Sequence, residues 1–318
     1  MTTNNLTLSF APHIRGCDKV KYTMLDVIIA LIPALIGGIY FFGINSLILT
    51  VISVASCITF EYLWCILTKK PNTTGDLSAV ITGLLLAFSV PPTLPAYMIV
   101  AASAFSIIIV KCCFGGIGQN IVNPALAGRA FLLAGWPSEM TKYVQPNDAF
   151  SLFSKGTADA VTGATPLSYI KGLENAEPST LSDMFFGNVS GCIGEVSAFL
   201  LLIGGLYLIV KRVINPVIPI TYLVSLGLFG MIFGSNGGFL YHILAGGAFL
   251  GAFFMATDYT TTPVTKTGMF VFALGAGILT GVIRIFGGYP EGVTYAILFM
   301  NVCVPLIDKK IMPRVFGH

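Results

Sequence analysis

The sequence predicts an all-α polytopic membrane protein with about ten transmembrane helices. Its residues are 55% hydrophobic and only 10% charged, whereas a typical soluble domain contains roughly 25% charged residues. The mean hydropathy is +0.85. Successive apolar runs approach the ~20 residues that a helix needs to cross a bilayer. These three observations favour one helical bundle over two soluble domains for a chain of 318 residues.

The apolar runs define the expected spans, and a pair of prolines interrupts one of them. The third run is short for ~30 Å of hydrocarbon. It ends at Val90-Pro91-Pro92, where neither proline can continue a helical hydrogen-bond ladder. We therefore expect a broken helix at this place. The expected spans cover residues 24–42, 45–67, 77–90, 96–113, 120–135, 191–212, 217–233, 240–256, 268–286 and 293–307.

The two halves of the chain share a weak internal repeat. Phe114-Gly115-Gly116 follows the fourth expected span, and Phe286-Gly287-Gly288 follows the ninth. Because five spans separate the copies, the second copy would be inverted in the membrane, as in transporters built from discontinuous helices. The alternative is chance similarity in a chain with 35 glycines. The expected organisation is an N-terminal segment 1–23, a first five-helix repeat 24–135, a loop 136–190, a second five-helix repeat 191–307 and a tail 308–318.

Lysine and arginine gather on one side of this layout. Twelve of the 17 lie on the side of both termini, four lie on the opposite side, and Arg129 falls inside a span. Because cytoplasmic loops carry the excess of positive charge, we expect both termini in the cytoplasm and the long loop outside the cell membrane. The twelve are Arg15, Lys19, Lys21, Lys69, Lys70, Lys111, Lys211, Arg212, Lys266, Lys309, Lys310 and Arg314, and the four are Lys142, Lys155, Lys171 and Arg284.

The sequence lacks the usual signatures of metal, nucleic-acid and NAD binding. No pair of its seven cysteines has C-x-x-C spacing, so we expect small buried thiols and no metal site. The alternative is that Cys112 or Cys113 supplies a ligand to a partner's metal site. The loop 136–190 contains six acidic residues and three lysines, which argues against nucleic acid. No G-x-G-x-x-G fingerprint follows a strand, and we expect no catalytic residue.

One polar motif lies in the outer loop, between the two apolar halves. It reads Asp159-Ala160-Val161-Thr162-Gly163-Ala164-Thr165-Pro166-Leu167. Gly163 and Ala164 add little side-chain bulk, and Pro166 disfavours helical backbone at Thr165, which should keep this threonine extended. Asp159 offers a carboxylate for recognition. The alternative is an ordinary turn that contains threonines.

This motif resembles the D-x-x-[ST]-G-A-T-x-L sequence at which a flavin transferase attaches FMN to the final threonine through a phosphoester. The sequence occurs in the family that comprises the D subunit of Rnf ion-translocating electron-transport complexes and the B subunit of sodium-pumping NADH:quinone reductases. Pro12-His13-Ile14-Arg15, Phe114-Gly115-Gly116 and the segment 123–133 also agree with this family. The chain lacks the N-terminal extension of the reductase protein, so we expect the Rnf branch of the family.

The resemblance implies a membrane subunit that carries electrons through FMN on Thr165, with Thr162, Gly163, Ala164 and Asp159 forming the attachment motif. It implies coupling of electron transfer between ferredoxin and NAD to Na⁺ or H⁺ transport, in a complex with the A, B, C, E and G subunits of Rnf. A noncovalent riboflavin is a further implied cofactor. The alternatives are a component of a sodium-pumping reductase, a redox-inactive channel or transporter, and a purely structural assembly subunit.

Charged residues within the expected spans require a structural or functional role, because a charge near the bilayer centre costs ~2.5–3.5 kcal/mol on insertion scales. For Glu61 we weigh an ion route against a buried ion pair. For Arg129 we weigh a flavin phosphate or ring carbonyl against a buried carboxylate. Asp26 and Arg284 lie near expected helix ends, which predicts interfacial positions. Three polar residues are expected to line a second flavin site or the ion route, and they are Asn123, Thr82 and Asp258.

Overall fold

The computed structural model describes residues 20–70, 72–146, 165–172, 178–234, 237–288 and 291–311. The regular elements of these residues are helices, and three of them are long and apolar enough to cross a membrane. These three are α1 (Val20–Phe42), α2 (Ile44–Thr68) and α13 (Lys266–Phe286). The predicted class of an all-helical polytopic membrane protein is confirmed.

The first half continues with helices shorter than a full span. They are α3 (Ser78–Phe88), α4 (Ala96–Ala104), which continues into the π-helical η2 (Phe105–Cys112), and α5 (Pro124–Gly135). A short 3₁₀ turn, η1 (Thr74–Asp76), precedes α3. The side chain of Asn123 caps α5 by accepting hydrogen bonds from the backbone of Ala125 and Leu126, which explains why this helix begins later than the expected residue 120.

The second half begins later than predicted and contains a broken span. Residues 191–197, expected to be helical, are irregular, and Ser197 caps α9 (Ala198–Val210). The expected span 240–256 is divided by residues 245–247, with Gly246 at φ 59°. Its pieces are α11 (Phe239–Leu244), α12 (Ala248–Leu250) and the π-helical η4 (Gly251–Met255). The other spans are α10 (Val217–Phe233) and α14 (Val293–Lys310).

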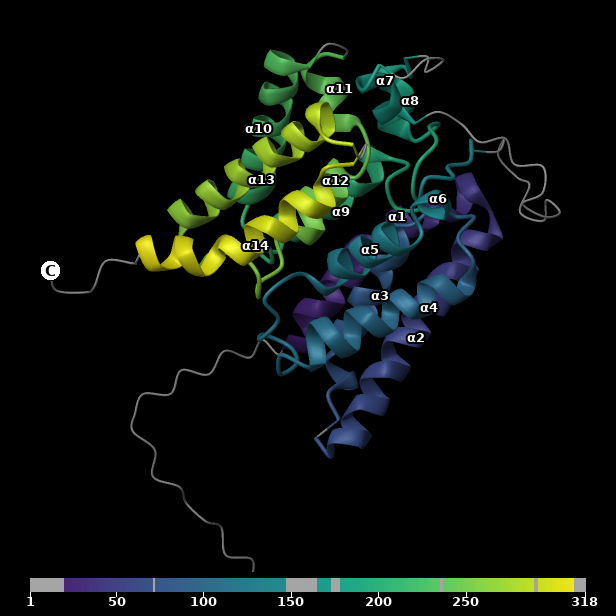
Figure 1. Ribbon diagram of the computed structural model, residues 1–318, viewed down its shortest axis with the longest axis vertical. Coiled ribbons are helices and arrows are strands. Elements are labelled where there is room, and N and C mark those ends of the chain that lie inside the picture. The colour runs from purple at the N-terminus through teal and green to yellow at the C-terminus, as the bar shows by residue number, and fades with distance from the viewer. Residues whose placement is uncertain are drawn as a thin grey trace, which may run out of the picture.

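The two halves lie side by side, with the purple-to-teal helices of the first half against the green-to-yellow helices of the second (Figure 1). Contacts between the halves join α1 to α9 and α5 to α14. Small residues allow this approach, since a Cβ on Gly204 of α9 would clash with the carbonyl oxygen of Ala30 in α1. One large apolar core cluster includes residues of both halves.

The chain segment that connects the two halves contains short helices that lie outside the main bundle. They are α6 (Pro137–Met140), α7 (Pro166–Ile170) and α8 (Leu181–Phe186). Figure 1 shows α7 and α8 at the same end of the molecule as α11, and contacts join α8 to α11 and α7 to α13.

Two of the breaks between described helices, one in each half, lie at a non-helical residue with a positive φ. Leu77, at φ 67°, precedes α3, and Gly246 divides α11 from α12. A basic side chain reaches each break. Lys111 donates to Ser78 Oγ at 2.6 Å, and Arg284 donates to the carbonyl oxygen of Ala245 at 2.8 Å. An internal repeat would give this correspondence, and the repeat and its boundaries stay a prediction.

Candidate functional site

Thr165 is held in extended backbone at the first turn of α7. Its φ is −83° and its ψ is 157°, so the effect predicted for Pro166 is confirmed. The hydroxyl lies 3.0 Å from Ser168 Oγ, and the residue is only 7% exposed. The remaining motif residues lie outside the described residues, and they are Asp159, Thr162, Gly163 and Ala164.

The segment that follows Thr165 is fixed to the second half of the bundle at two points. Leu167 lies against the break, where a Cβ on Gly246 would be 2.7 Å from its Cδ1. Lys171 Nζ donates to the carbonyl oxygens of Gly287 and Gly288, both at 2.8 Å. Burial lowers the pKa of Lys171. These contacts hold Thr165 close to the broken span.

Thr165 faces a small cavity that two carboxylates also line. The cavity has a volume of about 20 Å³, and its walls include Thr165, Tyr143, Glu195, Gly246 and Glu291. This volume accommodates roughly one water molecule. Only a group of about this size therefore fits beside the Thr165 hydroxyl in the cavity.

Arg129 joins these carboxylates in a buried charge cluster. Its guanidinium donates to Glu195 Oε1 at 2.9 Å and also to Glu291 Oε2. Tyr143 donates to Glu291 Oε1 at 3.4 Å, and burial raises the pKa of this tyrosine. Of the two interpretations weighed for Arg129, the structure contains the ion pairs with buried carboxylates. The cluster connects α5 to the segments that precede α9 and α14.

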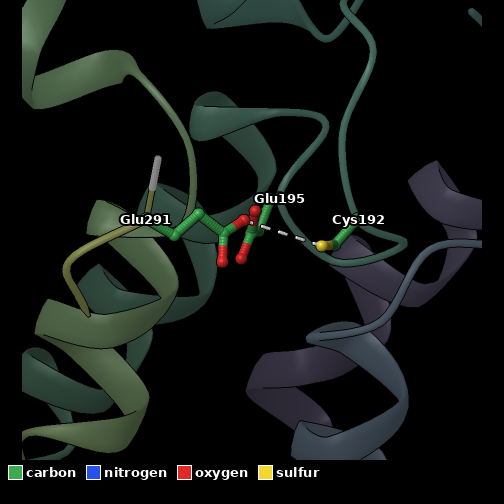
Figure 2. A group of neighbouring side chains, drawn as sticks. All are labelled: Cys192, Glu195 and Glu291. Atoms are coloured by element: carbon green, nitrogen blue, oxygen red, sulfur yellow. Dashed lines mark hydrogen bonds between the residues drawn. The ribbon is translucent and has the colours of Figure 1, made fainter. Parts of the chain in front are cut away.

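Cys192, Glu195 and Glu291 also form a group with metal-ligand chemistry (Figure 2). Their candidate ligand atoms all lie within 4.8 Å of one another. Arg129 donates to all three side chains, with its Nη2 3.5 Å from Cys192 Sγ. The guanidinium thus already supplies the positive charge that these groups need.

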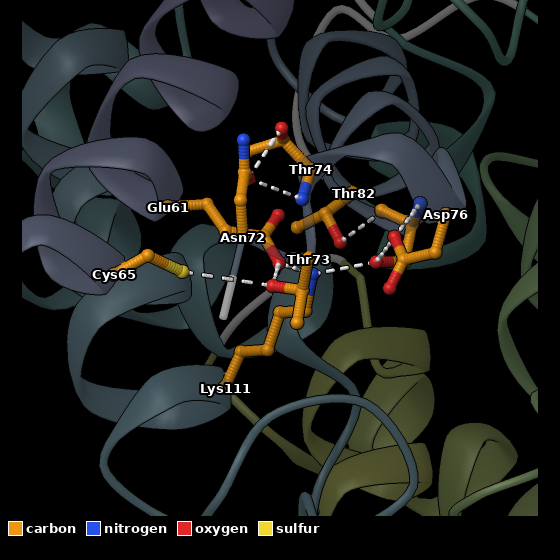
Figure 3. Close-up of polar contacts among 9 residues, drawn as sticks. Glu61, Cys65, Asn72, Thr73, Thr74, Asp76, Thr82 and Lys111 are labelled. Atoms are coloured by element: carbon orange, nitrogen blue, oxygen red, sulfur yellow. Dashed lines mark hydrogen bonds and ion pairs between the residues drawn. The ribbon is translucent and has the colours of Figure 1, made fainter. Parts of the chain in front are cut away.

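A second charge cluster lies at the break before α3 (Figure 3). Lys111 Nζ donates to Glu61 Oε1 at 2.8 Å and to Ser78 Oγ, and Thr73 donates to the same Glu61 oxygen at 2.8 Å. Glu61 and Lys111 are only 1% and 3% exposed. The buried pair weighed for Glu61 is therefore present. The side chain of Lys111 turns inward to Glu61, and the predicted side of the membrane for this residue stays a prediction.

A larger cavity of about 110 Å³ adjoins this second cluster. It brings together Thr82, Asn123 and Asp258, the three polar residues expected to share a site, and adds Lys111 and Asn120 to them. Asn123 also donates to the carbonyl oxygen of Met255 at 3.2 Å. The cavity has walls from both halves of the chain. Two of its lining residues are exposed, Ile117 and Tyr259.

Arg284 is completely buried, so its predicted interfacial position was wrong. Its guanidinium donates to the carbonyl oxygens of His242 and Ala245 at 2.7 and 2.8 Å. These carbonyls belong to the end of α11, where the break leaves them without helical partners. Gly246-Gly247 within an expected span was the available signal, because a break there creates acceptors that need a buried donor.

Comparisons with known proteins agree with this arrangement. A family model described as "NQR2, RnfD, RnfE family" matches residues 7–317. The chain is 48% identical to the D subunit of the Na(+)-translocating ferredoxin:NAD(+) oxidoreductase complex of Acetobacterium woodii, over 100% of this chain and 97% of the relative. It is 43% identical to the D subunit of the proton-translocating ferredoxin:NAD(+) oxidoreductase complex of Clostridium ljungdahlii, over 99% of this chain and 97% of the relative.

A third relative is the D subunit of the ion-translocating oxidoreductase complex of Halorhodospira halophila, which is 36% identical over 96% of this chain and 94% of the relative. The matches extend across both halves of the bundle and the loop between them. The family resemblance inferred from the motif of Thr165 is thereby confirmed. The chain belongs to the NQR2, RnfD, RnfE family.

Proposed function

We propose that this chain is the D subunit of an ion-translocating ferredoxin:NAD(+) oxidoreductase complex of the Rnf type, and that it carries electrons through FMN attached covalently to Thr165. Relatives that are 48% and 43% identical over nearly their whole length bear this name. The chain would not act as an enzyme alone, because the donor and acceptor reactions belong to other subunits. The expected partners are the A, B, C, E and G subunits of the complex and a flavin transferase.

The observation that carries this proposal is the setting of Thr165. Its backbone is extended, its hydroxyl faces a cavity lined by Glu195 and Glu291, and the following residues are anchored at a helix break. A threonine that served only as a turn residue would not need this anchoring. An attached cofactor does, because the protein's contribution to a flavin's chemistry is to position it and tune its potential.

Attachment would form one bond and break another at phosphorus. The oxygen of the Thr165 hydroxyl bonds to the phosphorus of the FMN half of FAD, the bond from that phosphorus to AMP breaks, and a base of the transferase takes the hydroxyl proton. A transferase needs access to the hydroxyl, yet Thr165 is 7% exposed. We therefore place attachment before the segment 165–171 docks against α13.

The second cavity is the proposed site of a noncovalent flavin without a phosphate. Lys111 lines this cavity, but its charge is already neutralised by Glu61. Asp258 adds a further carboxylate to the walls. A phosphate would find no free cation among the described lining residues, whereas the amides of Asn120 and Asn123 suit an uncharged ring. These properties favour riboflavin over FMN.

The ion route is proposed to pass Glu61 and Asp258. Glu61 Oε2 has no hydrogen-bond partner among the described residues although it is buried, which leaves an acceptor for a cation or a proton. Relatives are named for Na(+) and for proton translocation, so both ions suit the same framework. The positive-inside pattern supports cytoplasmic termini and an outer position for Thr165.

The decisive experiment compares Thr165→Ala with Ser168→Ala. The protein is produced with its native flavin transferase, and in-gel flavin fluorescence and protein mass are measured after denaturing electrophoresis. Fluorescence should persist in Ser168→Ala, which removes the described hydroxyl 3.0 Å from Thr165 Oγ. It should vanish in Thr165→Ala. A nonfluorescent wild-type band without the FMN mass would instead support a channel or transporter without redox activity.

A purely structural role is tested by coupled transport. The Thr165→Val complex should assemble but lose electron transfer from ferredoxin to NAD and the associated ion transport. Full coupled activity in this variant would mean that the covalent flavin is dispensable for electron transfer and ion transport.

A further inference from the structure

Two irregular loops, one from each half of the chain, carry exposed apolar side chains. The first loop covers residues 113–122, between η2 and α5, and the second covers residues 257–265, between η4 and α13. Apolar side chains that gather on a surface mark a site of interaction more often than single ones do. The exposed large apolar residues of the two loops are Phe114, Ile117, Ile121, Tyr259 and Val264.

The two loops meet at the larger cavity. Ile117 and Tyr259 line this cavity of about 110 Å³ from the outside, where both are exposed. Asn120 and Asp258, from the same two loops, contribute polar groups to its walls. A molecule that covered Ile117 and Tyr259 would therefore also close the entrance of the cavity.

The backbone of the first loop follows a path that glycine makes possible. Gly115, Gly116 and Gly118 have φ values of 123°, 101° and 86°. An added Cβ on Gly116 or Gly118 would meet no atom within 4 Å, so the left-handed backbone is what favours glycine at these two positions. The loop thus has a defined turn that leaves Phe114 and Ile117 at the surface.

Neither lipid tails nor headgroups are a suitable cover for these loops. Lipid-exposed irregular backbone does not occur within the hydrocarbon layer, so both loops lie outside it. Segments that bind headgroups are rich in Lys, Arg, Trp and Tyr, and residues 113–122 include none of these four types. Residues 257–265 include one tyrosine and no Lys or Arg. The core of a protein–protein interface is depleted of charge in the same way.

We propose that the loop pair, residues 113–122 and 257–265, is the docking surface for an extramembrane protein subunit of the same complex, which presents an apolar face and closes the entrance of the larger cavity. The inference rests on membership of such a complex, for which relatives of this chain are named. Docking would exclude water from the entrance. The charges of Lys111 and Asp258 would then act in a medium of lower dielectric constant, where their interactions are stronger.

The first test is photocrosslinking in the whole complex. Benzoylphenylalanine replaces Ile117 in one variant and Tyr259 in another, and the illuminated product is identified by mass. Both positions should link to one and the same extramembrane subunit. The control position is Leu274 on α13, which is 36% exposed against 38% for Ile117, and it should link only to lipid or to membrane-embedded subunits. A product at Ile117 that contains only lipid, or a second copy of this chain, would overturn the proposal.

The second test measures how much of that extramembrane subunit purifies with the chain. Ile117→Glu should lower the amount about tenfold, as loss of a central interface residue does, and Ile117→Leu should retain it. Val264→Glu, at an 81% exposed position of the other loop, decides the matter if Ile117→Glu fails to fold.

Salt separates an apolar contact from a charged one. A wash at about 1 M salt screens exposed charges and should leave the subunit bound. Release by this wash, or unchanged amounts in both glutamate variants, would overturn the role of the loop pair. A wild-type chain that purifies without any other subunit would instead overturn its membership of the complex.

Discussion

Leu167 packs against Gly246, so that the segment carrying Thr165 rests on the break of the eighth span. A Cβ at Gly246 would lie 2.7 Å from Leu167 Cδ1, and the glycine has φ 59°. The contact joins a loop residue to the interior of the second half. A change of structure at the break would therefore displace Leu167, which lies two residues from Thr165.

Gly246→Ala should loosen this contact and destabilise the protein. The left-handed backbone conformation costs a residue with a Cβ about 1–2 kcal/mol, and the added methyl group displaces Leu167. The melting temperature in detergent should fall, and attached flavin should become more accessible to a soluble quencher. Gly135→Ala is the matched control, because nothing lies within 4 Å of its added Cβ. Equal melting temperatures for the two variants would contradict the packing.

Lys171→Ala should make Thr165 easier to modify. The lysine ties the end of α7 to Gly287 and Gly288, and releasing it favours the undocked segment. Purified apo protein incubated with flavin transferase and FAD should gain fluorescence faster than wild type. Lys142→Ala removes another lysine of the same loop, with a side chain that is 51% exposed. Its rate should match the wild type, and an unchanged rate in Lys171→Ala would mean that the transferase reaches the docked threonine.

Breaking the pair of Glu61 and Lys111 should be more damaging than removing both charges. A single Lys111→Met leaves an uncompensated buried carboxylate, a change that costs about 3–5 kcal/mol in other proteins. The double variant Glu61→Gln, Lys111→Met should recover much of the lost stability. Thermal unfolding of all three proteins measures this coupling. Recovery of stability without recovery of ion transport would support the proposed ion route, and additive losses would argue against the pair.

Asp258→Asn should stabilise the protein at neutral pH. Burial raises the pKa of Asp258 above its ordinary value of 3.8, so the folded state binds more protons than the unfolded state between the two pKa values. The free energy of unfolding of the wild type therefore falls as the pH rises through that window. The Asp258→Asn variant lacks this carboxylate, so its free energy of unfolding does not fall for this reason. Its advantage in melting temperature should be largest near pH 7 and shrink on acidification, and an advantage that does not change with pH would contradict the raised pKa of Asp258.

Impermeant thiol labelling of intact cells tests the orientation. In a Cys113→Ser background, which removes a native exposed thiol, Ser182→Cys should react from outside and Lys70→Cys should not. Both positions are exposed. The opposite pattern would place Thr165 on the cytoplasmic side.

Composition and apolar periodicity were sufficient for the class and for the existence of the spans, because lipid restricts the backbone to hydrogen-bonded helices. They were insufficient for residues 191–197, because the strongly apolar run that follows was extended back over them although they include two glycines and Glu195. Gly194 and Ile193 there donate to the carbonyl oxygens of Phe88 and Val90. Such pairing between distant segments satisfies the backbone without a helix, and the identity of the paired segment has no local signal.

The part of the site that depends on local sequence was predictable. Thr165 and its extended backbone followed from the motif and from Pro166. The inward direction of the Lys111 and Arg284 side chains was not predictable, for a different reason. Each lies near the end of an apolar run, and hydropathy cannot distinguish a side chain that extends to the interface from one that turns back to a helix break.

The helix α5 links the two proposed cofactor regions over a short distance. Asn123 caps its start and lines the larger cavity, while Arg129, six residues later, holds the carboxylates beside Thr165. At 1.5 Å per residue this is about 9 Å along the helix axis, against a hydrocarbon layer of ~30 Å. Along this helix the two polar regions are therefore separated by less than a third of the hydrocarbon thickness.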